Sequence, residues 1–237
     1  MLEGRKILVT GGAAGIGRAT AQLIRKRGGQ AYTIDLVDSP SDMDFHSRAN
    51  VTDYDQVDAA VREAADRMGG IDGLANVAGL GGGDLLEETD MARWHGLIDV
   101  NLTGPLNMAR ATIPYLRQAA EASIVNISSG VALHPMPRTG AYAAAKSGLI
   151  ALSRTWAMEL APSIRVNALC PGPVVTTMLS MTNADPAELN RLRADNYALK
   201  RFARPEEIAT GIAFLLGSDA SFITGIVLPI DGGRTYY

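Results

Sequence analysis

Two side chains four residues apart, Tyr142 and Lys146, have the types and the spacing needed for proton transfer. The sequence predicts a helix here, and residues i and i+4 lie on one face of a helix. A tyrosine hydroxyl titrates near pH ~10, too high for a base at neutral pH, but a nearby ammonium group favours the phenolate. Lowering its pKa by ~3 units needs about 4 kcal/mol of differential interaction. The pair predicts general acid–base chemistry, although a buried tyrosine beside a solvated lysine has the same spacing.

A serine, Ser129, directly follows the apolar strand predicted over residues 123–128. In an open parallel sheet, ligands bind beyond the carboxyl ends of the strands. Ser129 and the start of the Tyr142 helix can therefore meet at that edge. A serine after a strand is more often a turn residue, so Ser129 gains its weight from the other two side chains.

The element that comes first in the chain is a glycine-rich run over residues 10–17, between an apolar run and a helical run. Glycines at positions 11, 15 and 17 let the backbone turn tightly and approach a ligand, while the start of the helix favours a pyrophosphate. The next apolar run, residues 31–34, ends in Asp35. That carboxylate is placed where the hydroxyls of an adenosine ribose need an acceptor. The arrangement predicts a dinucleotide site; a glycine-rich turn in some other α/β protein is the alternative.

Apolar runs and helical runs alternate along the chain, which favours one α/β domain, residues 1–237, over two small ones. We predict a Rossmann-type, doubly wound parallel sheet with helices on both faces. Strands are expected at residues 6–9, 31–35, 45–49, 72–76, 123–128, 165–170 and 226–230. Helices are expected at residues 18–25, 53–68, 90–118 (bent at Pro105 and Pro114), 141–160 and 205–217.

Composition narrows the class of function. The formal net charge of −3 gives no electrostatic case for nucleic acid or an anionic membrane as a partner. No apolar run approaches the ~20 residues of a membrane span, and the first residues lack the pattern of a signal peptide. The one cysteine, Cys170, excludes an internal disulfide and fits a reducing compartment. The three histidines have no metal-ligand spacing. We expect a cytoplasmic protein without a metal site.

Taken together, these residues resemble the short-chain dehydrogenase/reductase family, nearly from end to end. The motifs that carry the resemblance are residues 10–17, Asp35, Asn76 to Gly79, Asn101, Ile127 to Ser129, Tyr142 to Lys146, Pro171 to Val174, residues 204–209 and residues 231–233.

The resemblance implies hydride transfer between NAD and a secondary alcohol or ketone. Tyr142 would exchange the proton of the substrate hydroxyl, and Ser129 would hydrogen-bond the same oxygen. Lys146 would bind the nicotinamide ribose and lower the pKa of Tyr142, and Asn101 would hold a water that links Lys146 to solvent. A homotetramer built through paired long helices and the C-terminal strand is also implied; residues 141–161 are apolar over more than one helical face, which supports it.

NAD is the expected cofactor. Thr176 and the backbone at Val174 would hold its carboxamide or pyrophosphate. The complete set of cofactor-binding residues that the resemblance implies is Gly11, Ala14, Gly15, Ile16, Gly17, Asp35, Asn50, Val51, Asn76, Ala78, Gly79, Tyr142, Lys146, Pro171, Gly172, Val174, Thr176 and Met178.

The adenosine end of that site carries the information on cofactor choice. Asp35 should accept hydrogen bonds from both ribose hydroxyls and repel a 2′-phosphate. Ala14 and Leu36 supply no cation for such a phosphate. Two positions depart from the family's pattern: Val77 stands where asparagine is frequent, and Asn50 where an aspartate usually contacts adenine. The amide oxygen of Asn50 could still accept a hydrogen bond from the adenine amine.

The substrate is less well defined, because the walls of such pockets come from loops. Apolar residues after Pro173, including two methionines, predict a substrate-lid segment, residues 178–200, over an apolar or cyclic secondary alcohol or ketone. A helix packed permanently on the core has the same pattern. The alternatives are a small hydroxy acid held by Arg138, a 3-oxoacyl reductase, and a non-catalytic NAD-sensing regulator. A regulator need not keep four proton-transfer residues, so the enzyme is favoured.

Overall fold

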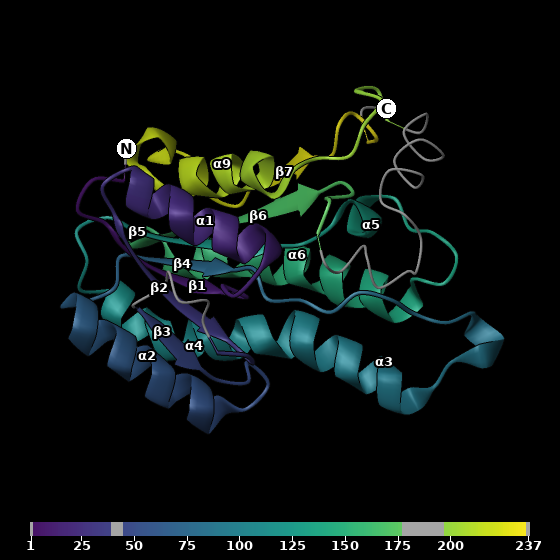
Figure 1. Cartoon of the computed structure of the whole chain (residues 1–237), viewed down its shortest axis with the longest axis horizontal. Helices are drawn as coiled ribbons and strands as arrows, with labels where there is room; N and C mark the ends of the chain where they lie inside the picture. The colour runs from purple at the N-terminus through teal and green to yellow at the C-terminus, as the bar shows by residue number, and fades with distance from the viewer. Residues whose placement is uncertain (1, 39–44, 177–196, 236–237) are drawn as a thin grey trace.

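A computed structural model describes residues 2–38, 45–176 and 197–235. A seven-stranded parallel sheet with the strand order β3-β2-β1-β4-β5-β6-β7 forms its centre. Helices cover both faces: α1 and α9 lie on one face, and α2, α4 and α6 lie on the other (Figure 1). This arrangement confirms the predicted doubly wound Rossmann-type fold.

The strands are β1 (Lys6–Thr10), β2 (Gln30–Asp35), β3 (His46–Arg48), β4 (Gly73–Asn76), β5 (Ala122–Ile127), β6 (Ile164–Pro171) and β7 (Val227–Ile230). The α-helices are α1 (Gly15–Lys26), α2 (Tyr54–Met68), α3 (Met91–Ile98), α4 (Gly104–Leu116), α5 (Gly130–Leu133), α6 (Gly140–Leu160) and α9 (Pro205–Leu216). Short helical turns of other types are η1 (Leu86–Glu88), η2 (Asp99–Thr103) and η4 (Ser218–Ala220). Every predicted strand is present, with its ends within about one residue of the expected positions.

The core consists of two apolar layers, one on each face of the sheet. Successive side chains of β1 point into different layers. Ile7 and Val9 pack in the layer under α1 and α9, whereas Leu8 packs in the layer under α2, α4 and α6. Because β1, β4 and β5 are covered on both faces, all of their residues except Lys6 are buried. None of the helices within the described residues has both the length and the apolar character needed to cross a membrane.

Local signals explain where several helices begin and end. The side chain of Asp53 accepts hydrogen bonds from the first amides of α2, at 3.1 and 3.2 Å, and Gly69 ends that helix in a left-handed conformation. Pro205 occupies the first turn of α9, where its missing N–H leaves no hydrogen bond unmade. Each of these ends was predicted from the sequence to within a residue or so.

The long helical region predicted over residues 90–118 differs in detail. It is one run in which η2, a π-helical turn, joins α3 to α4. Pro105 cannot donate to the carbonyl four residues earlier, that of Asn101, and the widened turn lies at this missing hydrogen bond. Two further differences are that α1 begins three residues earlier than predicted, at Gly15, and that α5 was not predicted.

Candidate active site

The glycine-rich run forms a cradle at the carboxyl end of β1. Helix α1 begins inside it, and Ala14 in the N-cap position makes no side-chain cap, so the first amides remain available to a ligand. Gly11 and Gly15 have φ angles of 69° and 52°, in the left-handed region that favours glycine. A Cβ atom on Gly17 would collide with the carbonyl oxygen of Gly11. The cradle therefore has the close backbone approach and the free donors that a pyrophosphate requires.

Asp35 is the last residue of β2 and lies beside this cradle. Its Oδ2 accepts a hydrogen bond from the amide of Ala13 at 3.0 Å, and its Oδ1 accepts one from the amide of Leu36 at 2.7 Å. Oδ1 also accepts a longer hydrogen bond from the amide of Val37, at 3.4 Å, whereas Oδ2 keeps a further lone pair for a ligand. The carboxylate is thus fixed at the predicted adenosine end of the site.

The predicted adenine contact at Asn50 looks different in the structure. The side-chain Oδ1 of Asn50 accepts a hydrogen bond from the backbone amide of Thr52 at 3.0 Å. The backbone amide of Asn50 donates to Oε1 of Gln56, also at 3.0 Å. A contact to adenine would use the second lone pair of Oδ1. The neighbouring Val51 is buried against Gly104, where a Cβ would lie 2.8 Å from the valine side chain.

Thr10, at the end of β1, has a structural role that residue types and spacing did not indicate. Oγ1 of Thr10 accepts hydrogen bonds from the amides of Val77 and Ala78, at 2.9 and 3.0 Å. This hydrogen-bond pair ties the loop after β4 to the glycine-rich run. Ala78 and Gly79 consequently lie beside the glycine-rich run, and their contact with a cofactor stays a prediction.

Asn76 has a structural task that spacing could not indicate. Its Nδ2 donates to Oδ1 of Asn126 in β5 at 2.8 Å, and Nδ2 of Asn126 donates to Oγ of Ser153 in α6 at 2.9 Å. All three side chains are buried. The network links two strands to a helix of the catalytic side, and cofactor contact by Asn76 stays a prediction.

Ser129, Tyr142 and Lys146 come together beyond the end of β5. Ser129 follows the strand and accepts a hydrogen bond from the amide of Val131 at 3.2 Å, as the N-cap of α5. Tyr142 lies in the first turn of α6, and its hydroxyl lies near enough to the side chain of Ser129 for that side chain to lower the pKa of the tyrosine. Nζ of Lys146 lies 5.9 Å from the centroid of the Tyr142 ring.

Lys146 is almost completely buried, at 3% exposure. Its Nζ donates to the carbonyl oxygen of Ile127 at 2.8 Å, and the hydroxyl of Ser128 donates to the carbonyl of Lys146, also at 2.8 Å. Both bonds fasten α6 to the end of β5. Burial disfavours the ammonium form and lowers the pKa of Lys146 to about 8.

The protonation of Tyr142 differs from the expectation. The sequence predicts that Lys146 lowers the pKa of Tyr142, yet in this structure the pKa is raised, because burial outweighs the hydrogen bond from Ser129. The ammonium group points at a backbone carbonyl, and its own burial weakens its charged form. The chain alone therefore keeps the Tyr142 hydroxyl neutral.

Asn101 lies in the π turn η2, fully buried. Its Nδ2 donates to the carbonyls of Leu80 and Leu97, at 2.8 and 2.9 Å, and its Oδ1 accepts from the amide of Leu80 at 3.2 Å. A Cβ on Gly79 would lie 3.0 Å from Oδ1 of Asn101 and 3.5 Å from Nζ of Lys146. The turn thus brings Asn101 beside Lys146; the linking water stays a prediction.

The end of β6 supplies the opposite wall of the cofactor edge. A Cβ on Gly172 would lie 2.8 Å from the backbone of Asp231, so the two segments pack tightly. Val174 pairs with Ala203 in an isolated parallel bridge. The methyl group of Thr176 lies 3.2 Å from the position of a Cβ on Gly15, so Thr176 lies against the cradle, and its contact with the cofactor stays a prediction. Met178 and all of the proposed lid except its last residues, 197–200, lie outside the described residues.

Cys170 lies near Lys146 and Ser128. The sequence indicated this cysteine only as a small buried residue. It is fully buried, and burial raises the pKa of its thiol. Ser128, Lys146 and Asp231 all interact with it. Its position directly before Pro171 was the available signal, since Pro171 is the last residue of β6, the strand next to β5. Among the described residues, no group of His, Cys, Asp or Glu could hold a metal ion.

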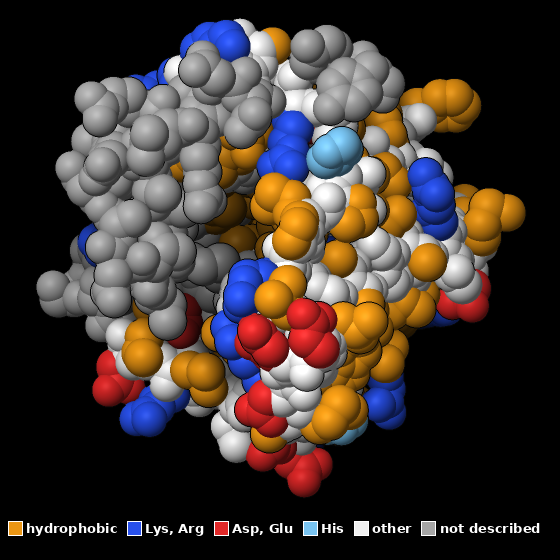
Figure 2. All heavy atoms as spheres, turned by 90° about the vertical axis from the view of Figure 1, so that its right-hand side faces the viewer, with side chains coloured by type: hydrophobic (Ala, Val, Ile, Leu, Met, Phe, Trp, Pro, Cys, Tyr) orange, Lys and Arg blue, Asp and Glu red, His pale blue; other side chains and the backbone are white. Residues whose placement is uncertain are grey.

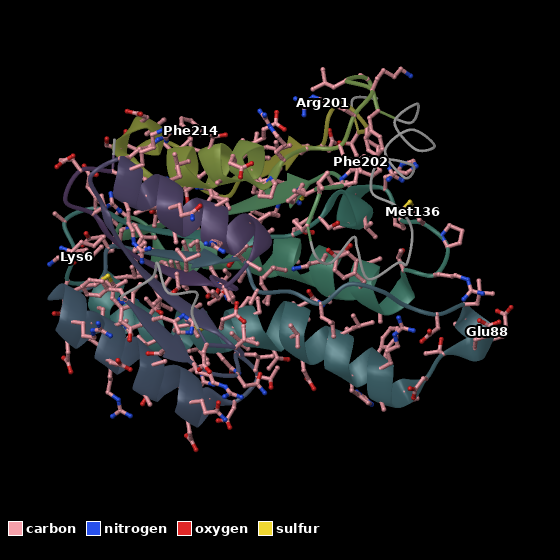
Figure 3. The ribbon with its side chains drawn as sticks, viewed as in Figure 1. Lys6, Glu88, Met136, Arg201, Phe202 and Phe214 are labelled. Atoms are coloured by element: carbon pink, nitrogen blue, oxygen red, sulfur yellow. The ribbon has the colours of Figure 1, made fainter. Side chains whose placement is uncertain are left out.

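A cavity of about 360 Å³ opens beside the start of α6. Apolar residues dominate its walls: Leu85, Leu86, Trp94, Leu97, Met136, Pro137 and Ala141. Glu88 and Met136 lie at the end of the molecule toward which the strands point, far from Lys6 (Figure 3). The same end in space-filling view has hydrophobic side chains beside a hollow and acidic and basic side chains close together (Figure 2).

Arg138 lies on the rim of this cavity in a left-handed conformation, with φ of 62°. Its guanidinium forms an ion pair with Glu88 at 3.3 Å, and both side chains are more than half exposed. The cation proposed to hold a substrate carboxylate therefore has a carboxylate partner in the chain itself.

Comparison with known proteins identifies the family. A family model described as enoyl-(acyl carrier protein) reductase matches residues 11–235. The chain belongs to the short-chain dehydrogenase/reductase family. A 3-oxoacyl-(acyl-carrier-protein) reductase of Thermotoga maritima is 38% identical over 245 residues, covering 98% of each chain.

Two further members of the short-chain dehydrogenase/reductase family are informative. The cis-4-hydroxycyclohexanecarboxylate dehydrogenase of Sinomonas cyclohexanicum is 36% identical, covering 98% of this chain and 96% of the relative. The crystal structure of a 3-ketoacyl-(acyl-carrier-protein) reductase from Brucella melitensis, complexed with NADH, is 30% identical. It superposes with a TM-score of 0.90 and covers 99% of this chain and 100% of that one.

As a member of the short-chain dehydrogenase/reductase family, the protein is an enzyme, an oxidoreductase that interconverts an alcohol and a ketone with a nicotinamide dinucleotide. The non-catalytic regulator is thereby set aside. The cradle around Gly17 and the uncapped start of α1 fit such a cofactor.

Proposed function

We propose that the protein is an NAD-dependent dehydrogenase of secondary alcohols, or in reverse a ketone reductase, with an apolar or cyclic substrate. The observation that carries the cofactor choice is the Asp35 carboxylate, held between the amides of Ala13 and Leu36 at the adenosine end. A carboxylate there accepts from ribose hydroxyls and repels a 2′-phosphate. Ala14 and Leu36 carry no opposing cation.

The cofactor would extend along the carboxyl edge of the sheet. The amides at the start of α1 would hold the pyrophosphate, and Lys146, Val174 and Thr176 would hold the nicotinamide half. The bound nicotinamide supplies the hydride acceptor or donor. The remaining chemistry, holding the substrate oxygen and moving its proton, falls to side chains of the chain itself.

Four side chains would carry that chemistry. The Tyr142 hydroxyl exchanges a proton with the substrate oxygen, and the nearby side chain of Ser129 holds the same oxygen. Lys146, whose pKa is about 8, can gain and lose a proton near neutral pH. Asn101 connects the Lys146 side to the loop at Leu80, which is partly exposed.

The substrate class follows from the walls. The cavity beside α6 is lined mainly by apolar side chains, which suits a cyclic or apolar body. The hydroxycyclohexanecarboxylate for which one relative is named contains such a ring. The alternative of a small hydroxy acid depends on Arg138, which is already paired with Glu88. The 3-oxoacyl alternative is supported by the 38% identical relative.

A substrate panel tests the proposal. Cyclic alcohols, hydroxysteroids, polyols, hydroxy acids and 3-oxoacyl thioesters are assayed with NAD(H) and with NADP(H), following nicotinamide absorbance. We expect cyclic secondary alcohols to react best and NAD to exceed NADP at least about tenfold in kcat/KM, since a carboxylate facing a phosphate costs on the order of 1.4 kcal/mol or more. Equal efficiency with both cofactors would refute the NAD assignment.

We also propose that the whole chain, residues 1–237, works as one domain within a homotetramer in the cytoplasm. Large apolar side chains exposed near the C-terminal part support association: Phe222 is fully exposed, and Phe214 is 40% exposed. Strand β7 is an edge strand, which can pair with another chain. The unpaired thiol of Cys170 fits a reducing compartment. Light scattering at micromolar concentration tests the assembly, and a monomer would contradict it.

A further inference from the structure

Strand β3 lies at the edge of the sheet, directly beside the residue proposed to select the cofactor. It pairs in parallel with β2, and Arg48 stands in register with Asp35. Residues paired in register along neighbouring strands have their side chains on the same face of the sheet. Arg48 therefore leaves the sheet on the same side as the Asp35 carboxylate, although 12 residues separate them in the sequence.

The side chains of β3 hold the turn that follows Asp35. Nε of Arg48 donates to the carbonyl oxygen of Leu36 at 2.9 Å. Nε2 of His46 lies 3.0 Å from the carbonyl oxygen of Val37, which can only accept, so this ring nitrogen donates. Asp35 holds the same turn from its other side, since its Oδ1 accepts from the amides of Leu36 and Val37 at 2.7 and 3.4 Å.

The guanidinium group of Arg48 has more donors than this contact uses. It carries five N–H groups in a planar fork, and only the one at Nε is needed for the carbonyl of Leu36. Arg48 is exposed, so its outer nitrogen atoms can meet a ligand. Such a fork suits a phosphate better than an ammonium group does.

We propose that Arg48 is a specificity-determining residue at the adenosine end, a cation placed to bind the 2′-phosphate of NADP once the charge of Asp35 is removed. This proposal rests on the proposed use of the Asp35 edge by the adenosine ribose. Positions 14 and 36 contain no cation, so the sequence alone indicates no phosphate site; the pairing of β3 with β2 supplies one. The preference for NAD then depends on Asp35 alone.

Binding titrations on purified full-length protein test this. NADH and NADPH are titrated by nucleotide fluorescence, independently of any substrate, for wild type, Asp35→Ser, Arg48→Gln, the double variant Asp35→Ser/Arg48→Gln and Asp35→Ser/Arg48→Lys. The matched control is Asp35→Ser/Arg27→Gln, which removes the same charge at the C-terminus of α1, just before the start of β2 and so at the other end of that strand from Asp35. Thermal unfolding of each variant checks that it folds.

We expect Asp35→Ser to tighten NADPH binding about tenfold or more, and Arg48→Gln in that background to lose roughly tenfold while NADH binding changes less than about threefold. Arg48→Lys should keep part of the gain, because it keeps the charge without the fork. Arg27→Gln should lose none of it. Higher salt should shrink the Arg48 contribution.

The proposal is overturned if Arg48→Gln leaves NADPH binding of the Asp35→Ser protein within about twofold, or weakens NADH and NADPH equally, since either result makes Arg48 merely structural. Should Asp35→Ser not fold, the isosteric Asp35→Asn replaces it, and Arg48→Gln in that background must weaken NADPH binding while NADH binding does not weaken. Failure of the proposed function has another signature, equal binding of NADH and NADPH by the wild type, whatever Arg48→Gln does.

Discussion

The glycine-rich cradle proposed to hold the cofactor and the proposed catalytic group, Ser129, Tyr142, Lys146 and Asn101, lie at the same end of the strands but are built differently. The cradle, around β1 and α1, acts through its backbone: free amides, left-handed glycines and positions where no Cβ fits. The proposed catalytic group, beyond β5 and along α6, would act through side chains, of which Lys146 and Asn101 are buried and held in place by distant parts of the chain. A backbone site is thus defined by local residue types, whereas a side-chain site depends on its surroundings for its protonation.

The largest effect should follow from Tyr142→Phe, which removes the proton donor of the catalytic group and barely changes its volume. We expect kcat to fall on the order of 10²- to 10⁴-fold, while NADH binding stays within about threefold, since the cradle is untouched. Tyr115→Phe, a half-buried tyrosine of α4, is the control. Near-normal turnover in Tyr142→Phe would contradict the assigned chemistry.

Lys146→Met should show the cost of burying a charge in the catalytic group. The pKa of Lys146 falls from 10.5 to about 8 on folding, so the folded protein binds fewer protons between these pH values. The free energy of unfolding therefore increases as the pH rises from 8 to 10.5. Below pH 8, the burial of the Lys146 ammonium group lowers that free energy by its full amount, up to about 3 kcal/mol.

The expected outcome is that Lys146→Met gains stability relative to wild type at pH 7 and that this gain shrinks toward pH 10. Denaturant unfolding at several pH values measures it. A pH-independent difference between the two proteins would show that Lys146 is charged equally in the folded and unfolded states.

Gly17→Ala should break the cradle and spare the catalytic group. The added Cβ collides with the carbonyl of Gly11, so we expect NADH binding to weaken roughly tenfold or more and stability to fall by about 1–3 kcal/mol. Gly96→Ala in α3, where nothing lies within 4 Å of the new Cβ, is the matched control and should bind NADH normally. Isothermal titration reports both variants, and unchanged NADH affinity in Gly17→Ala would mean that the cofactor lies elsewhere.

The smallest effect is expected at the rim of the cavity. Because Arg138 is paired with Glu88 and largely exposed, Arg138→Ala should change kcat/KM for cyclic alcohols less than about threefold. Glu88→Gln frees the guanidinium and serves as the companion variant. If Arg138→Ala selectively abolishes activity on a carboxylate substrate and Glu88→Gln raises it, the hydroxy-acid alternative replaces the apolar one.

Much of the architecture could be predicted because its signals are local. Buried parallel strands are continuous apolar runs, and caps such as Asp53 and Pro205 mark helix ends within a few residues of the chain. The π turn at Asn101 was less accessible: the sequence indicated a bend at Pro105, but how a helix absorbs a missing hydrogen bond depends on what packs around it.

The candidate site divides in the same way. Glycine positions, Asp35 and the Tyr142–Lys146 spacing are properties of short segments and were found from the sequence. The network through Asn76, the carbonyl partner of Lys146 and the pairing of Arg138 join residues tens of positions apart. No spacing rule indicates them.

The sequence by itself determined the order of strands and helices, the backbone cradle and the residue types that can move a proton, because these depend on near neighbours and on side-chain chemistry. Only the tertiary structure decided the protonation and the charged neighbours of those residues. Burial raises the pKa of Tyr142 and lowers that of Lys146, and pairing of β3 with β2 brings Arg48 beside Asp35. Desolvation and the distance between charges are set by the folded chain, since both depend on which remote segments exclude water from a side chain.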